Sequence, residues 1–208
     1  MDTAMCVSSW AFLPDKQEKQ TYLVSEFQSE FFSFVYGASL NYGYIAAKVA
    51  ADTTIWGYQE IRRRQCYWLD KKKLMERIIR TTNISLWQKH KDKLYQKGLW
   101  VDGVCCILGE KTAWIGLFGE ASVVEIRKSG EERSMGTINE DGENSRKKLG
   151  ADRYSIDIQI ASFPFEQGDT FLFAIGKSAS YSNELLHLLF QEKEINKEGD
   201  GVFFLKHI

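Results

Sequence analysis

The sequence has few residues that break or cross-link a chain. Its 208 residues include two prolines, Pro14 and Pro164, and no segment of biased composition. Disordered chains are rich in proline and poor in aromatic residues, whereas aromatics make up 13% and hydrophobic residues 44% of this chain. The composition therefore predicts a folded chain, long enough for a single domain that spans residues 1–208 and buries a full core.

An excess of charge of one sign is also lacking. Lys and Arg total 27 and Asp and Glu total 28, so the formal net charge is −1. No overall field would attract nucleic acid or anionic lipid, and we expect neither as a partner. No apolar run approaches the roughly 20 residues that cross a bilayer, and the opening MDTAMCVSSW does not resemble a secretory signal. These absences favour a cytoplasmic protein.

Metal-binding and nucleotide-binding patterns are absent as well. The four cysteines, Cys6, Cys66, Cys105 and Cys106, do not have the spacing of a zinc site. Cys105 and Cys106 lie in an apolar run, which predicts core thiols in a reducing compartment. The histidines form no HxxxH or HxH pair, and no GxGxxG or GxxxxGK[ST] loop occurs.

The pattern of apolar residues changes along the chain between strand and helix periods. Glycine-containing turns (GEK, FGEA and KSGE) divide residues 101–136 into four apolar runs, which predicts an antiparallel meander. Strands and helices are segregated, which favours an α+β fold with antiparallel sheets. The expected elements are strands at 7–13, 21–27, 31–36, 155–161, 169–175 and 201–208, and helices at 42–61, 70–96 and 181–193.

The helix expected at 70–96 has the clearest pattern. Asp70 is placed to cap its first turn, and Gly98 is placed to end it. Its apolar stripe recurs every four residues, at Leu74, Ile78, Thr82, Leu86, His90 and Leu94. A histidine on such a stripe is expected to be structural rather than a ligand.

Five short motifs, in one order along the chain, together resemble a known family. FEQGDTFLFAIGKSAS is similar to L-x-x-GD-x-[FL]-[LV]-L-x-[ST]-DG, and KTAWIGLFGEASVVEIRKSGE to the hairpin K-L-x-[VW]-A-N-x-GDSRAYL-x-R-x-G. ENSRKKLG, DKQEKQTYLV and FVYGASLNYGYIAAKVA match three further motifs. Over nearly its whole length the chain resembles the metal-dependent type 2C (PPM) Ser/Thr protein phosphatases.

The resemblance implies two antiparallel sheets packed face to face, with helices on the outer faces. It also implies two Mg²⁺ or Mn²⁺ ions that activate a bridging water. Hard dications require charged oxygen ligands, and two ions close together repel unless anions bridge them. The family's carboxylate positions therefore decide what this chain can do.

At those positions the carboxylates are mostly missing. The family's bridging aspartate falls on Tyr36, although the glycine after it is kept as Gly37. Another ligand aspartate falls on Gly176, and the acidic residue of the opening motif falls on Thr21. A neutral phenol is a poor ligand for Mg²⁺ or Mn²⁺.

Other positions of the motifs are partly retained. The opening basic residue matches Lys16, and the GDSR motif is represented by residues 119–122, with Glu120 as its acid. Asp200 falls where the family has its last metal-binding aspartate, which makes it the surviving ligand candidate. Two glycines that follow the first motif are replaced by Ser39 and Leu40.

These substitutions predict a catalytically inactive, phosphatase-like domain that acts as a protein-binding or regulatory module, with no cofactor and an unidentified protein partner. One alternative is a working metal-dependent phosphatase with rearranged Mn²⁺ or Mg²⁺ ligands, drawn from Glu120, Asp200 and Glu18. A second alternative is a self-associating structural subunit, suggested by abundant tryptophan. A basic rim at residues 62–64 and 71–73 could also bind an acidic partner, although its ordinary interpretation is a solvated surface.

Overall fold

The protein is described by a computed structural model. It describes residues 23–28, 30–37, 42–64, 70–90, 98–136, 147–176 and 202–206, and only the backbone at 23–28, 90 and 202–206. The strand expected at 7–13, the helix expected at 181–193 and the last residues of the helix expected at 70–96 lie outside these ranges.

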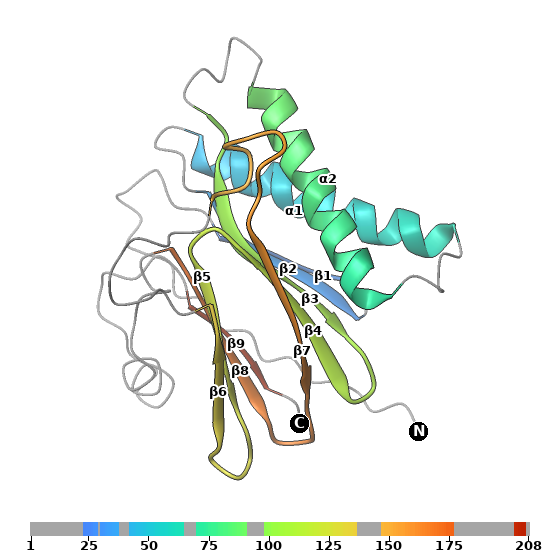
Figure 1. The fold of residues 1–208 in the computed structure, drawn as a ribbon, viewed down its shortest axis with the longest axis vertical. Coiled ribbons are helices and arrows are strands. Elements are labelled where there is room, and N and C mark those ends of the chain that lie inside the picture. The colour runs from blue at the N-terminus through green and yellow to red at the C-terminus, as the bar shows by residue number, and fades with distance from the viewer. Residues whose placement is uncertain are drawn as a thin grey trace.

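Two antiparallel sheets form the body of the molecule (Figure 1). The first sheet has five strands in the order β1-β2-β3-β4-β7, and the second has four in the order β6-β5-β8-β9. The strands of the first sheet are β1 (Leu23–Gln28), β2 (Phe31–Gly37), β3 (Val101–Leu108), β4 (Thr112–Phe118) and β7 (Ile158–Pro164). The strands of the second are β5 (Ala121–Ile126), β6 (Glu132–Met135), β8 (Thr170–Ile175) and β9 (Val202–Lys206).

The alternation of side chains along the strands divides the core into two clusters. One cluster fills the space between the sheets and includes Phe32, Phe34, Val104, Cys106 and Phe173. The other lies on the opposite face of the first sheet, where β2 contributes Phe31 and Val35. Strands of the first sheet are therefore apolar on both faces, which explains why β3 is buried along its whole length.

Two helices cover the outer face of the first sheet (Figure 1). They are α1 (Gly43–Arg63) and α2 (Lys71–His90). The buried side of α1 is rich in alanine, which allows it to lie close to the strands, and Ala46, Ala47, Ala50 and Ala51 are fully buried there. Neither helix is long and apolar enough to cross a membrane in the part of the chain that is described.

Several sequence predictions are confirmed by this architecture. The fold is α+β with two packed antiparallel sheets, and Asp70 caps α2 by accepting a hydrogen bond from the Lys72 amide at 3.1 Å. The thiols of Cys105 and Cys106 are buried in the core. The expected stripe of α2 is buried at Leu74, Ile78, Thr82 and Leu86.

The predicted meander over residues 101–136 is wrong. β3 pairs with β4 and β5 pairs with β6, but β4 and β5 belong to different sheets. The FGEA segment therefore carries the chain from one sheet to the other instead of closing a hairpin. β5 pairs on its other side with β8, which follows it by more than 40 residues.

The strand predicted at 155–161 lies three residues later, at Ile158–Pro164. The residues before it are held in a turn, because Oδ1 of Asp152 accepts hydrogen bonds from the amides of Tyr154 (2.9 Å) and Ser155 (3.1 Å). Asp and Asn side chains favour such turns by bonding to backbone N–H groups just ahead of them.

Candidate functional site

The strand ends bring several of the singled-out residues together at one end of the sandwich. Tyr36, at the end of β2, is the cross-strand partner of Asp102, at the start of β3. Paired residues project to the same face of a sheet, and Tyr36 packs against the cluster between the sheets. Asp102 therefore lies on the inner face as well, beside the phenol that stands where the resemblance places a carboxylate.

Asp102 is a buried carboxylate with two strong partners. Its side chain has no exposed surface, Oδ2 accepts a hydrogen bond from Nζ of Lys148 at 2.7 Å, and Oδ1 accepts one from the Glu120 amide at 3.0 Å. The same Lys148 nitrogen lies 3.5 Å from Oε1 of Glu120. One ammonium group thus lies between two carboxylates.

The backbone around Lys148 determines where this ammonium lies. Leu149 forms a β-bridge with Val101, in which the two residues exchange N–H···O bonds of 3.1 and 3.0 Å. The next amide, that of Gly150, donates to Oδ1 of Asn83 on α2 at 2.8 Å. These contacts fix residues 148–150 against the start of β3, so Lys148 reaches Asp102 from a defined position.

Burial determines the protonation of Asp102 more than its ion pair does. Loss of solvation raises the pKa of Asp102 from 3.8 to about 6, although the Lys148 charge and the Glu120 amide both act to lower it. A raised carboxyl pKa means that removal from water outweighs the nearby positive charge. Above pH 6 the group is charged and depends on Lys148 for compensation.

Two glycines at the site have packing roles. A β-carbon on Gly37 would overlap the carbonyl of Gly43, so the glycine allows the first turn of α1 to pass directly over the end of β2. Gly119 has a positive φ of 62°, and a β-carbon there would overlap Oδ1 of Asp102. The close approach of α1 thus requires a glycine at position 37, and the close approach of the Asp102 carboxylate requires one at position 119.

The second sheet joins the site through backbone contacts. The amide of Gly176, just after β8, donates to the carbonyl of Glu120 at 2.7 Å. Tyr36, Asp102, Glu120 and Gly176 therefore form a connected series across the two sheets. The other singled-out positions, Lys16, Thr21, Ser39, Leu40 and Asp200, lie outside the described residues.

Among the described residues, the donors at this end of the sandwich do not fit a pair of divalent metal ions. Tyr36 and Gly176 provide no carboxylate where the resemblance calls for one, and the two described carboxylates, Asp102 and Glu120, already share the Lys148 ammonium. Across the described ranges, no group of three or more His, Cys, Asp or Glu residues is arranged to hold a metal ion. An ammonium among the ligands would repel a dication, because both carry positive charge.

Sequence reasoning missed the two residues at the centre of this cluster. Asp102 is the only charged residue of the apolar strand VDGVCCIL, and a lone charge in a buried strand indicates a compensating partner. This lone charge could have identified Asp102 from the sequence. Lys148 had no such signal, since Lys147 beside it is chemically identical and hydrogen-bonds instead to Ser155.

Solved structures show which class of protein has this architecture. The catalytic domain of the serine/threonine protein phosphatase PstP, in complex with two manganese ions, superposes with a TM-score of 0.69 at 10% identity, over 97% of this chain and 96% of that one. Serine/threonine phosphatase Stp1 from Staphylococcus aureus gives 0.64 at 18% identity, over 100% and 97% of the two chains. PppA, a regulatory component of the type VI secretion system in Pseudomonas aeruginosa, gives 0.62 at 11% identity, over 98% and 97%.

The chain therefore has the fold of the type 2C (PPM) Ser/Thr phosphatases, as the motifs predicted. No protein-family model and no curated protein sequence matches it. At these identities the likeness establishes the fold, and the chemistry must be argued from the residues of this chain.

Proposed function

We propose that this chain is a catalytically inactive domain with the type 2C phosphatase fold, which acts as a protein-binding or regulatory module. The supporting observation is the Lys148 ammonium, 2.7 Å from Asp102 and 3.5 Å from Glu120, at the strand ends where Tyr36 and Gly176 replace carboxylates. An internal cation there compensates the remaining acids without any bound metal.

The size of the electrostatic effect favours this interpretation. Two unit charges 4 Å apart interact by about 4 kcal/mol at an effective dielectric constant of 20, so an ammonium and a dication would repel by about 8 kcal/mol. A second dication would add to this repulsion. Carboxylates at positions 36 and 176 could offset such terms, but a phenol and a glycine cannot.

The partner we propose is a protein in the cytoplasm. A net charge of −1 gives no general attraction to nucleic acid or to anionic lipid. The described residues also contain no helix suited to a bilayer. A compact sandwich that has lost its catalytic carboxylates retains its surfaces, and those surfaces are what a regulatory domain uses.

Phosphatase turnover tests the proposal. Chelator-treated protein should hydrolyse p-nitrophenyl phosphate and phosphoserine peptides no faster than buffer, with or without millimolar Mn²⁺. The rival enzyme with rearranged ligands predicts Mn²⁺-dependent turnover that Asp102→Asn or Asp200→Asn abolishes. Glu166→Gln, at the far end of the sandwich, is the matched control that removes a carboxylate without touching the site.

A further inference from the structure

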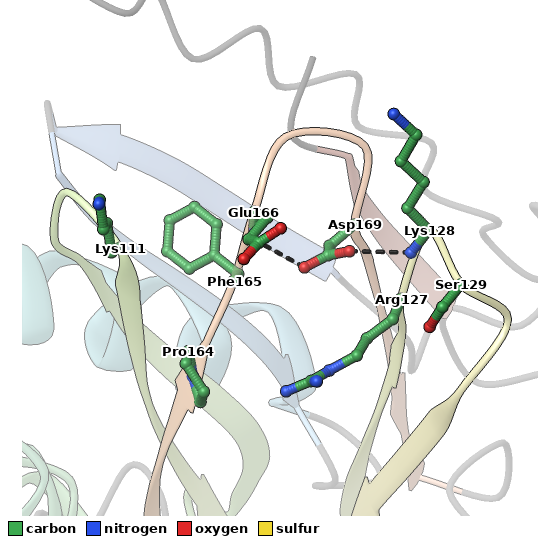
Figure 2. Close-up of a pocket in the computed structure, with 8 residues that line it drawn as sticks. All are labelled: Lys111, Arg127, Lys128, Ser129, Pro164, Phe165, Glu166 and Asp169. Atoms are coloured by element: carbon green, nitrogen blue, oxygen red, sulfur yellow. Dashed lines mark hydrogen bonds between the residues drawn. The ribbon is translucent and has the colours of Figure 1, made fainter.

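A polar cavity lies at the opposite end of the sandwich from Asp102, where β3, β5 and β7 end. Three turns enclose it: the β3–β4 turn, the β5–β6 turn and the segment between β7 and β8 (Figure 2). Its volume is about 290 Å³. The lining residues are Lys111, Arg127, Lys128, Ser129, Pro164, Phe165, Glu166 and Asp169.

Hydrogen bonds between the turns hold the cavity in shape. Oδ1 of Asp169 accepts the Lys128 amide at 2.9 Å and Oδ2 accepts the Glu166 amide at 2.7 Å (Figure 2). The Phe165 amide donates to the carbonyl of Lys111 at 3.1 Å. All three turns are thereby joined, and both Asp169 oxygens are engaged by backbone groups inside the protein.

Positive charge is available in this cavity. Lys111, Arg127 and Lys128 line it from two of the turns, and the Lys128 side chain extends with its ammonium turned away from Asp169 and Glu166 (Figure 2). Within the described part of the chain, no carboxylate lies within 4.0 Å of the Lys111 or Lys128 ammonium. Of the two lining carboxylates, that of Asp169 is engaged as described and that of Glu166 belongs to an exposed residue.

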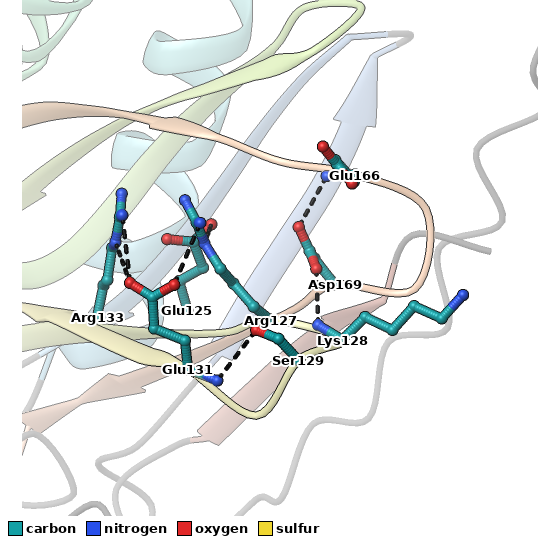
Figure 3. A network of polar contacts seen from close by, with 8 residues as sticks. All are labelled: Glu125, Arg127, Lys128, Ser129, Glu131, Arg133, Glu166 and Asp169. Atoms are coloured by element: carbon teal, nitrogen blue, oxygen red, sulfur yellow. Dashed lines mark hydrogen bonds and ion pairs between the residues drawn. The ribbon is translucent and has the colours of Figure 1, made fainter.

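Arg127 is held in place by two acids of its own hairpin. Its guanidinium donates to Oε2 of Glu131 at 3.3 Å, and its Nε lies 3.7 Å from Oε1 of Glu125 (Figure 3). Glu125 is fully buried, and among the described residues neither its oxygens nor Nε of Arg127 has a hydrogen-bond partner. Loss of solvation raises the pKa of Glu125, and the nearby charge of Arg127 acts to lower it.

We propose that this cavity binds a small oxyanion, a phosphate or carboxylate group, through Lys111, Arg127 and Lys128. Arg and Lys donors form charge-assisted hydrogen bonds to such groups. Ligand pockets usually span roughly 300–1,000 Å³, so a cavity of about 290 Å³ has room for a small anionic group. Pro164 and Phe165 form an apolar wall beside the cations, suited to the carbon chain that carries the anion.

This site is independent of the proposed loss of catalysis, because its residues lie at the opposite end of the strands from Asp102. Titration of the full chain with inorganic phosphate, at constant ionic strength and followed by amide NMR shifts, tests it. The amides of Lys128, Ser129 and Glu166 should shift with saturation in the millimolar range. A Lys111→Met/Lys128→Met double variant should weaken binding at least tenfold.

Controls make this experiment decisive. Neither lysine has an ion pair with any described residue, so the double variant should fold normally, whereas Arg127→Met would leave the buried Glu125 without its cation. Lys89→Met removes an exposed charge at the far end of α2 and should leave phosphate binding unchanged. Absence of saturable shifts, or equal binding by the wild type and the double variant, would overturn the site.

The ligand source is resolved by comparing three probes: free phosphate, a phosphoserine tripeptide and the matching glutamate tripeptide. Tighter binding of the phosphoserine peptide than of free phosphate would assign the pocket to a phosphorylated side chain. Tighter binding of the glutamate peptide would assign it to a carboxylate, and a preference for free phosphate to the ion itself. Each of these results supports the site only if the double variant no longer binds the preferred probe.

Discussion

The ammonium nitrogen of Lys148 lies 2.7 Å from Oδ2 of Asp102, a carboxylate with no exposed surface. This contact joins residues 46 positions apart in the sequence and links the segment before β7 to the inner face of the first sheet. Through Glu120, which bonds to both Asp102 and Gly176, it extends to the second sheet. The pair therefore connects the two sheets at this end of the sandwich.

Lys148→Met should destabilise the protein strongly, because it leaves Asp102 buried without a compensating charge. Removing one partner of a buried ion pair costs about 3–5 kcal/mol, and the lower end applies because the Lys148 side chain is 29% exposed. Urea unfolding measures the loss. Lys147→Met, on the neighbouring exposed lysine, should change the free energy of unfolding by less than about 1 kcal/mol.

Adding Asp102→Asn to the Lys148→Met variant should recover most of that loss, since the uncompensated charge is then gone. The double-mutant cycle separates this coupling from general effects of substitution. If Lys148→Met and Lys147→Met cost the same, the ion pair contributes nothing to the fold.

The stability of the wild type should depend on pH through Asp102. Its pKa is raised from 3.8 to about 6 on folding, so the folded state binds an extra proton between these values. The contribution of Asp102 to the free energy of unfolding is fully present below pH 4 and is lost as the pH rises through 6. Asp102→Asn removes the effect, so the variant should gain about 2 kcal/mol relative to wild type between pH 4 and pH 7.

Chemical unfolding of the two proteins at several pH values checks this. The charged groups that face Asp102 are Lys148 and Glu120, and both remain in the variant. If the difference in unfolding free energy between wild type and Asp102→Asn stayed constant with pH, the pKa of Asp102 would not be raised on folding.

Gly119→Ala should be more destabilising than Gly130→Ala, although both glycines have positive φ angles of 62° and 85°. A left-handed backbone costs an alanine roughly 1–2 kcal/mol at either position. Only at Gly119 does the added β-carbon overlap Oδ1 of Asp102, whereas the space around Gly130 is open. If the two variants lost equal stability in thermal or urea unfolding, the close contact between Gly119 and Asp102 would be contradicted.

The Cys105 and Cys106 thiols should be unreactive in the folded protein. Burial raises the pKa of Cys105 to about 12 and holds the pKa of Cys106 well above its usual value, so neither forms the reactive thiolate. Iodoacetamide at pH 8 followed by peptide mass spectrometry should find both unmodified in the native protein and modified in denaturant. Labelling of either cysteine at the rate of an exposed thiol would contradict their burial.

Local patterns were sufficient to predict most of the described elements. Apolar runs in FFSFVYG and VDGVCCIL correspond to β2 and β3, and the four-residue stripe from Leu74 to Leu86 lies on the buried side of α2. Local patterns do not identify a strand's partner, and the meander prediction failed for that reason. A glycine turn such as FGEA has the same composition whether it closes a hairpin or connects two sheets.

The site was predictable only in part, for a similar reason. Motif order singled out Tyr36, Gly37, Glu120 and Gly176, which the structure places at one end of the sandwich, whereas their role remains a prediction. The Lys148–Asp102 contact depends on the β-bridge between Leu149 and Val101, a pairing between distant segments. No periodicity or spacing distinguishes Lys148 from Lys147, so only the fold shows which lysine points inward.

Calorimetric titration of chelator-stripped protein with Mn²⁺ tests the central claim most directly, with a Lys148→Ser variant in parallel. We expect no heat beyond dilution for the wild type up to millimolar Mn²⁺, because the Lys148 ammonium lies among the acids. Measurable Mn²⁺ binding by the folded serine variant would add support, since Asp102 and Glu120 would then be free for a cation. Stoichiometric binding of one or two ions by the wild type, lost in Asp102→Asn or Asp200→Asn, would contradict the account and restore the enzyme as the better explanation.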